Sequence, residues 1–136
     1  MGLSTDVIAL EDTELHEAFP EVNPAYRVQS RGIMPQHLSA LNTILAGNAL
    51  SAATSYELVH QASEEGPWLY RIPDSLVLVL ANLPHDKIGA AALEWNKNPD
   101  LRATETGSLR ELIEGLCAVA RRGRSEGKRL YLWVCL

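Results

Sequence analysis

The sequence of 136 residues lacks most of the features that identify a chemistry, and each absence excludes a class of protein. It has only two cysteines, Cys117 and Cys135, in no CxxC spacing, so we expect neither a disulfide framework nor a cysteine-ligated metal site. The apolar run from Leu76 to Leu83 is far shorter than the roughly 20 residues that a membrane-spanning helix needs. We therefore expect no membrane association.

The first residues, MGLSTDVIALED, contain no basic group and no long apolar stretch, so no secretory signal is predicted. Two widely separated cysteines also fit a reducing compartment better than an oxidising one. Together these features favour a cytoplasmic protein.

Catalytic motifs are equally scarce. The sequence contains no GxSxG, no P-loop, no GxGxxG and no HExxH. Its histidines lie at wide spacings, without a pair at i and i+4, at positions His16, His37, His60 and His85. We therefore predict no catalytic residue, no cofactor and no metal ligand, although a site assembled only by the fold stays open.

Basic residues are absent from residues 1–26, which carry six acids: Asp6, Glu11, Asp12, Glu14, Glu17 and Glu21. By contrast, residues 102–136 carry seven basic groups and four acids. The net charge of −5 opposes binding to nucleic acid, which depends on basic residues that meet phosphates. The asymmetry predicts that the oppositely charged ends meet, either within one fold or in a head-to-tail contact between copies of this chain; the alternative is an acidic surface for a protein partner with a basic surface.

The composition, with 46% apolar and 21% charged residues, is typical of one globular domain over residues 1–136. Residues 5–10 predict a strand, and alternation in AYRVQSR predicts a second one with a solvent-exposed cationic face. A helical turn is predicted near residues 12–19. Apolar spacing of three and four predicts a helix from Pro35, ended by Gly47-Asn48. Residues 49–66 fit either a helix or a strand that turns at SEEG, and we favour a loop-rich segment.

The stretch PWLYRIPDSLVLVLANLPHDKIGAAALEW, residues 67–95, contains two of the three tryptophans. We predict two core helices here, the second with Ile88, Ala91, Ala92 and Trp95 on one face. A capping box at Ser108–Glu111 predicts the start of a long amphipathic helix that Gly127 ends. The final LYLWVCL predicts a strand buried on both faces. The expected fold class is α+β, with about four helices packed on a small mixed β-sheet.

The residues predicted to contact a partner form two groups. The first is the acidic amino-terminal segment, and the second is the turn before a tryptophan that a loop could leave partly exposed as a binding anchor. The predicted contact residues are Glu11, Asp12, Glu14, Glu17, Glu21, Glu64, Glu65 and Trp68.

Over residues 36–136 the order of elements resembles the YfbM-like domains, an uncharacterised bacterial family. The resemblance rests on Ile44-Leu45-Ala46-Gly47 at a helix end, GPWLYRIPDSL before a helix, and EGK before LYLW. It implies an α+β fold and a bacterial cytoplasmic protein, and it carries no functional residue.

Three functions are consistent with these features. The first is a non-catalytic protein-binding module that acts by occupying a partner, as a toxin-neutralising immunity protein does; an acidic surface suits a basic target. The second is an enzyme or small-ligand-binding protein whose site forms only in the fold. The third is a structural subunit of a homo-oligomer joined through its opposite charges.

Overall fold

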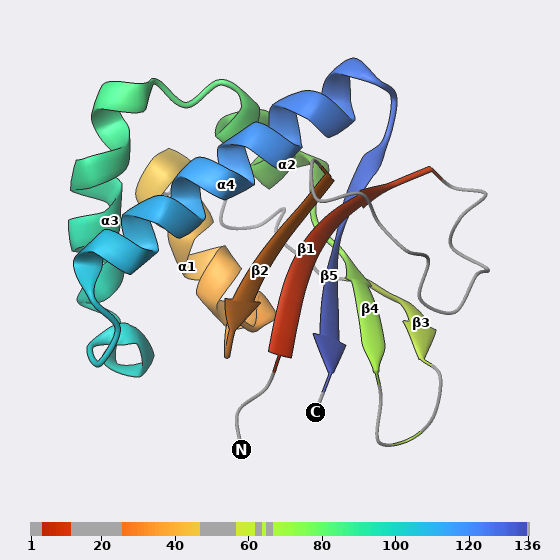
Figure 1. Cartoon of the computed structure of the whole chain (residues 1–136), viewed down its shortest axis with the longest axis horizontal. Helices are drawn as coiled ribbons and strands as arrows, with labels where there is room; N and C mark the ends of the chain where they lie inside the picture. The colour runs from red at the N-terminus through yellow and green to blue at the C-terminus, as the bar shows by residue number, and fades with distance from the viewer. Residues whose placement is uncertain (1–3, 12–25, 47–56, 62–63, 65–66, 136) are drawn as a thin grey trace.

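The computed structural model describes residues 4–11, 26–46, 57–61, 64 and 67–135 (Figure 1). The strands are β1 (Ser4–Leu10), β2 (Arg27–Arg31), β3 (Glu57–Gln61), β4 (Trp68–Arg71) and β5 (Arg129–Cys135). The helices are α1 (Pro35–Ala46), α2 (Asp74–Ala81), α3 (Ile88–Asn96) and α4 (Thr106–Ser125). Two short 3-10 helices, η4 (His85–Lys87) and η5 (Pro99–Leu101), come before α3 and α4. The predicted helical turn near residues 12–19 lies outside the described residues.

The five strands form one sheet in the order β2-β1-β5-β4-β3. All four strand pairs are antiparallel, so the sheet is antiparallel rather than mixed. The α+β class, with four described helices on one small sheet, is confirmed. The apolar β5 lies in the middle of the sheet, as its sequence predicted, because only a central strand buries side chains on both faces.

The helices gather on one side of the sheet (Figure 1). The core between the two layers takes Val7 and Ala9 from β1 and Leu130, Leu132 and Val134 from β5. The opposite face of the sheet carries a smaller buried cluster, which consists of Ile8 and Leu10 from β1, Leu69 from β4 and Tyr131 from β5. The period-two alternation of a strand therefore divides β1 and β5 between two apolar clusters.

Two of the predicted helical faces are confirmed. The residues of α3 that are buried are Ile88, Ala91, Ala92 and Trp95, which are the four of the predicted stripe. Helix α1 begins at Pro35, as predicted, and buries Leu38 and Leu41. No single described helix is both long and apolar enough to cross a bilayer; α2 and the η4–α3 segment reach that length only as a pair bent by 106°.

Two local predictions are wrong. Helix α4 begins at Thr106 with Glu105 as the N-cap residue, so Ser108 lies inside the first turn and caps nothing. Its carboxyl end is as predicted, since Gly127 has a φ of +72° and the Lys128 N–H donates to the Gly123 carbonyl at 2.8 Å, which closes a Schellman motif.

The second wrong prediction is the loop-rich segment. Residues 57–61 form β3 and pair with β4, so the strand alternative is correct for these residues.

Candidate functional site

A groove opens between the edge strand β2 and the amino-terminal half of α4, and we call it the β2–α4 groove. It has a volume of about 360 Å³. Its lining residues are Val28, Gln29, Ser30, Ile33, Thr104, Ser108, Leu109, Glu111 and Leu112. Four of these side chains are apolar and five are polar, which is the composition of a binding surface that combines an apolar area with hydrogen-bonding groups.

The path of α4 explains why the groove lies there. A Cβ atom on Gly115 would lie 3.2 Å from both γ-carbons of Val28, so the absence of a side chain lets the helix approach β2 closely at this point. Leu109 and Ile113 hold the same helix on the core. The groove occupies the part of α4 that comes before this close contact, from Ser108 to Leu112.

The outer edge of β2 borders the groove. All five residues of β2 lie opposite β1, from Arg27 beside Ile8 to Arg31 beside Ser4. Because β2 is an edge strand, the backbone N–H and C=O groups on its side away from β1 do not pair with β1. Among the described residues, none forms a backbone hydrogen bond to that edge. The groove therefore offers main-chain donors and acceptors beside an apolar surface.

The groove residues have no arrangement for covalent catalysis. The hydroxyl of Ser30 is 2.7 Å from that of Thr5 and donates to the Thr5 carbonyl at 3.2 Å. Ser108 is exposed, and the described lining residues include no histidine, lysine or cysteine that could activate it. Glu111 is the one charged residue of the lining. This chemistry suits binding of a ligand that offers hydrogen bonds, an apolar group and a positive charge.

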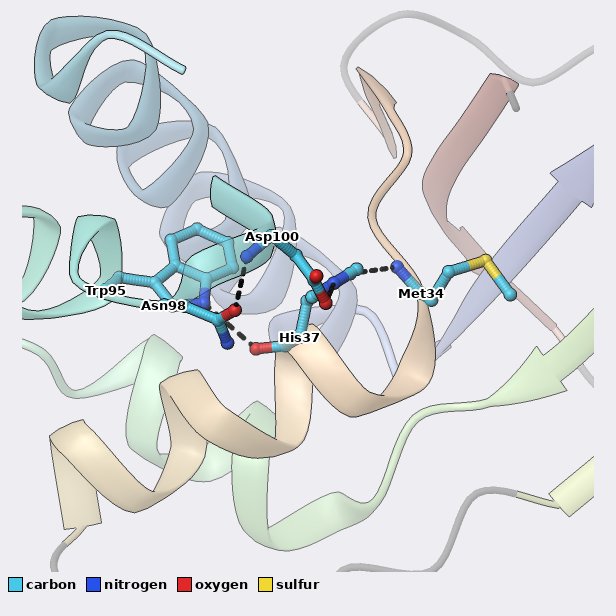
Figure 2. A network of polar contacts seen from close by, with 5 residues as sticks. All are labelled: Met34, His37, Trp95, Asn98 and Asp100. Atoms are coloured by element: carbon cyan, nitrogen blue, oxygen red, sulfur yellow. Dashed lines mark hydrogen bonds and ion pairs between the residues drawn. The ribbon is translucent and has the colours of Figure 1, made fainter. Parts of the chain in front are cut away.

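His37, one of the four scattered histidines, is buried and is the centre of a polar network that extends to the exposed Asp100 (Figure 2). Its Nδ1 accepts a hydrogen bond from the Met34 backbone N–H at 2.9 Å, and its Nε2 is 3.0 Å from Asp100 Oδ2. Because Nδ1 is an acceptor here, the Nε2 proton is donated to Asp100. His37 is the third residue of α1, and its ring accepts from the backbone N–H of Met34, the residue before the helix. The Glu side chain of a capping box makes the same contact.

The same network fastens α1 to α3 and η5. Trp95 Nε1–H donates to the His37 carbonyl at 3.0 Å, and the Asn98 side chain accepts from the Asp100 backbone N–H at 3.0 Å (Figure 2). Both ring nitrogens of His37 are bonded and its exposure is 5%. We therefore assign a structural role to this network. Sequence reasoning missed it because His37 and Asp100 are 63 residues apart.

Of the predicted contact residues, the three that the structure describes, Glu11, Glu64 and Trp68, do not come together. Glu11 is exposed and follows Leu10, which lies opposite Arg129 at one end of the sheet. Glu64 is exposed and precedes Trp68, which lies opposite Val134 near the other end. Trp68 lies in β4 rather than in a loop, is half-buried and packs on the helical core. This favours a structural role for its ring over a role as an exposed binding anchor. Asp12, Glu14, Glu17, Glu21 and Glu65 lie outside the described residues.

The basic residues near the end of α4 have structural contacts. The Arg121 guanidinium donates to the carbonyls of Ala81 at 3.0 Å and Leu83 at 2.8 Å, at the carboxyl end of α2. Arg122 and Lys128 lie over the ring of Tyr26, at 5.7 Å and 4.2 Å from its centroid. Arg121, Arg122 and Lys128 therefore each contact groups of the fold, which favours a structural role for these three cations.

Three further titratable groups, those of Asp6, Cys117 and Cys135, are wholly or partly buried. The buried Asp6 carboxylate accepts from Arg27 Nε at 2.7 Å. Cys117 is buried, and burial raises the pKa of its thiol above the usual value. Cys135 is half-buried near the end of β5. In the described part of the chain, no three His, Cys, Asp or Glu side chains lie together as metal ligands would.

Comparison of the chain with protein-family models, curated proteins and solved structures finds no match.

Proposed function

We propose that this chain is a non-catalytic protein-binding module and that the β2–α4 groove receives a segment of its partner. The observation that carries the proposal is the combination of an apolar surface, a polar rim and a strand edge that no described residue pairs. Such a combination supports recognition of a polypeptide, which brings both side chains and main-chain groups to a surface.

The charge supports a partner with a basic surface. The chain has a net charge of −5, and the one charged residue of the groove lining is Glu111. An acidic protein attracts a basic one during association and disfavours acidic competitors. An inhibitor or immunity-type protein that acts by occupying a basic partner is one concrete form of this function.

The test is capture of proteins by the wild-type chain and by two variants with a bulky side chain on α4. Ser108→Tyr fills the groove from its rim, and Ser108 is exposed, so the fold is not disturbed. Ala118→Tyr puts the same ring at an exposed position of α4 that does not line the groove. The lysate comes from the organism that encodes the chain, and thermal denaturation checks that both variants fold.

We expect a protein that is retained by the wild type and by Ala118→Tyr and is lost with Ser108→Tyr. The purified protein should then bind the wild type directly in isothermal titration calorimetry. Equal retention by all three chains would place the contact away from the groove. Retention of no protein by the wild type would contradict the binding function itself.

A further inference from the structure

We infer that the groove binds an extended segment that adds to β2 as a further antiparallel or parallel strand and carries a basic side chain toward Glu111. The inference rests on the proposed binding function of the β2–α4 groove. It names the conformation of the bound segment and its charge, neither of which follows from the existence of a groove.

The main chain of β2 supplies the first reason. Pairing with β1 holds five consecutive residues of β2 extended. Their backbone N–H and C=O groups on the side away from β1 form no hydrogen bond to the backbone of a described residue. An extended segment that lies along this edge continues the sheet, and its main-chain hydrogen bonds do not depend on its sequence. Strand addition therefore adds main-chain hydrogen bonds to the contacts that the side chains of the groove can make.

The direction of the side chains supplies the second reason. Val28 lies opposite Val7, a residue of the helical core, and contacts α4 at Gly115, so it points toward the helices. Side chains of an added strand alternate between the two faces of the sheet in the same way. Every second residue of the segment would therefore enter the groove beside Leu109 and Leu112.

Charge defines what those residues are. Glu111 is exposed, is the one charged member of the lining, and has neither a lysine nor an arginine beside it in that lining. A lysine or arginine at one groove-facing position can meet this carboxylate, whereas an acidic residue would be repelled. The next groove-facing position lies two residues away and meets the apolar residues. The expected pattern is basic–x–apolar or apolar–x–basic.

A second copy of this chain is a poorer occupant of the edge than a basic polypeptide. Two copies that each carry a net charge of −5 repel each other, whereas a basic segment is attracted. The charge of the chain therefore favours a different polypeptide.

The experiment selects random linear peptides displayed on phage against the wild-type chain, after depletion of the library on Ser108→Tyr. We expect enriched peptides to share a basic residue and an apolar residue two positions apart. Synthetic copies are then titrated into the isotope-labelled chain, and the backbone amide resonances of β2 should shift. The substitution Glu111→Gln should weaken binding by about twofold to fivefold, because it removes one exposed ion pair.

Methylation of the peptide nitrogens separates strand addition from other modes of binding. Methyl groups on one set of alternate amides remove the donors that face β2, and methyl groups on the other set leave them intact. We expect one set to weaken binding by about tenfold or more and the other to have little effect. Equal effects of the two sets, a preference for acidic peptides, or no enrichment over the Ser108→Tyr chain would each overturn the inference.

These outcomes differ from failure of the proposed function. If a cellular protein is lost with Ser108→Tyr but the selected peptides tolerate methylation of either set, the groove is a binding site and strand addition is wrong. If no cellular protein depends on the groove, the proposed function fails whatever the peptides show.

Discussion

Trp95 links the helical layer through both its ring and its indole nitrogen. It has an exposure of 0% and lies in the core formed by residues of every helix. Its N–H donates to the carbonyl of His37, which is itself buried. A single side chain thus provides apolar contact area and satisfies a polar group across the contact between α1 and α3.

Replacement of Trp95 by alanine should lower the free energy of unfolding by about 3–5 kcal/mol, because it leaves a cavity and removes a buried hydrogen bond. Leu93→Ala on the same helix is the control, since Leu93 has an exposure of 60%, and it should cost less than about 1 kcal/mol. Urea denaturation of both variants measures the difference. Similar costs for the two would contradict the assigned face of α3.

Asn42 differs from Trp95, because its buried polar group forms no hydrogen bond with the described residues. It has an exposure of 2%, and neither its Oδ1 nor its Nδ2 has a hydrogen-bond partner among the described residues. An unpaired buried amide is costly. The substitution Asn42→Leu should therefore raise the free energy of unfolding by about 1–2 kcal/mol, as urea denaturation can measure. A loss of stability would show that the amide is needed.

Tyr26 gives a prediction about pH. Its hydroxyl donates to the Glu126 carboxylate at 2.7 Å, and this hydrogen bond is the main reason that the pKa of Tyr26 lies above its usual value of 10.0. Since the folded pKa is the higher one, the contact stabilises the fold below pH 10 and is lost as the pH rises through the folded pKa. Carbon-13 NMR of the tyrosine ring should show Tyr26 titrating at a lower pH in Glu126→Gln. An unchanged titration would contradict the role of this hydrogen bond.

Among the elements, α4 determines both the core and the groove. It contributes Leu109, Ile113, Leu116 and Ala120 to the core, and its residues Ser108, Leu109, Glu111 and Leu112 line the groove. Its first turn has no side-chain cap, because the N-cap residue is Glu105, whose side chain accepts no hydrogen bond there. Serine is a much better N-cap residue.

Glu105→Ser should therefore raise the free energy of unfolding by about 0.5–1 kcal/mol. Ser108→Ala should change it by less than about 0.5 kcal/mol, because Ser108 caps nothing and is exposed. Thermal and urea denaturation of the two variants locate the start of the helix. A cost of about 1 kcal/mol for Ser108→Ala with no gain for Glu105→Ser would move that start to residue 108.

Periodicity in the sequence was sufficient to predict α1, the α3 face and the buried β5, because each depends on the spacing of apolar residues in one segment. The start of α4 was misplaced because Ser108 and Glu111 have capping-box spacing, whereas Thr106 and Gly107 can also be helical. The groove could not be predicted, since it joins Val28 to Leu112 across most of the chain. Gly115, inside a strongly amphipathic helix, was the available signal of a close approach.

For the whole molecule, three of the described acids, Glu11, Glu64 and Glu111, do not form one patch. Glu11 and Glu64 lie at opposite ends of the sheet, and Glu111 lies in the groove beside β2. In the proposed complex, the net charge of −5 would act at long range during association, and the groove would provide the specific contact. Binding of a basic partner should consequently become slower with added salt, while the contacts within the groove stay the same.

Amide hydrogen exchange of β2, in the free chain and in complex with the captured partner, tests the central claim most directly. Strand addition hydrogen-bonds the outward amides of β2 that β1 does not use, so we expect those amides to exchange about tenfold more slowly, or slower still, in the complex. The amides of β3, at the other edge of the sheet, serve as the internal control and should be unchanged. Protection at β3 with none at β2 would contradict binding at the β2–α4 groove.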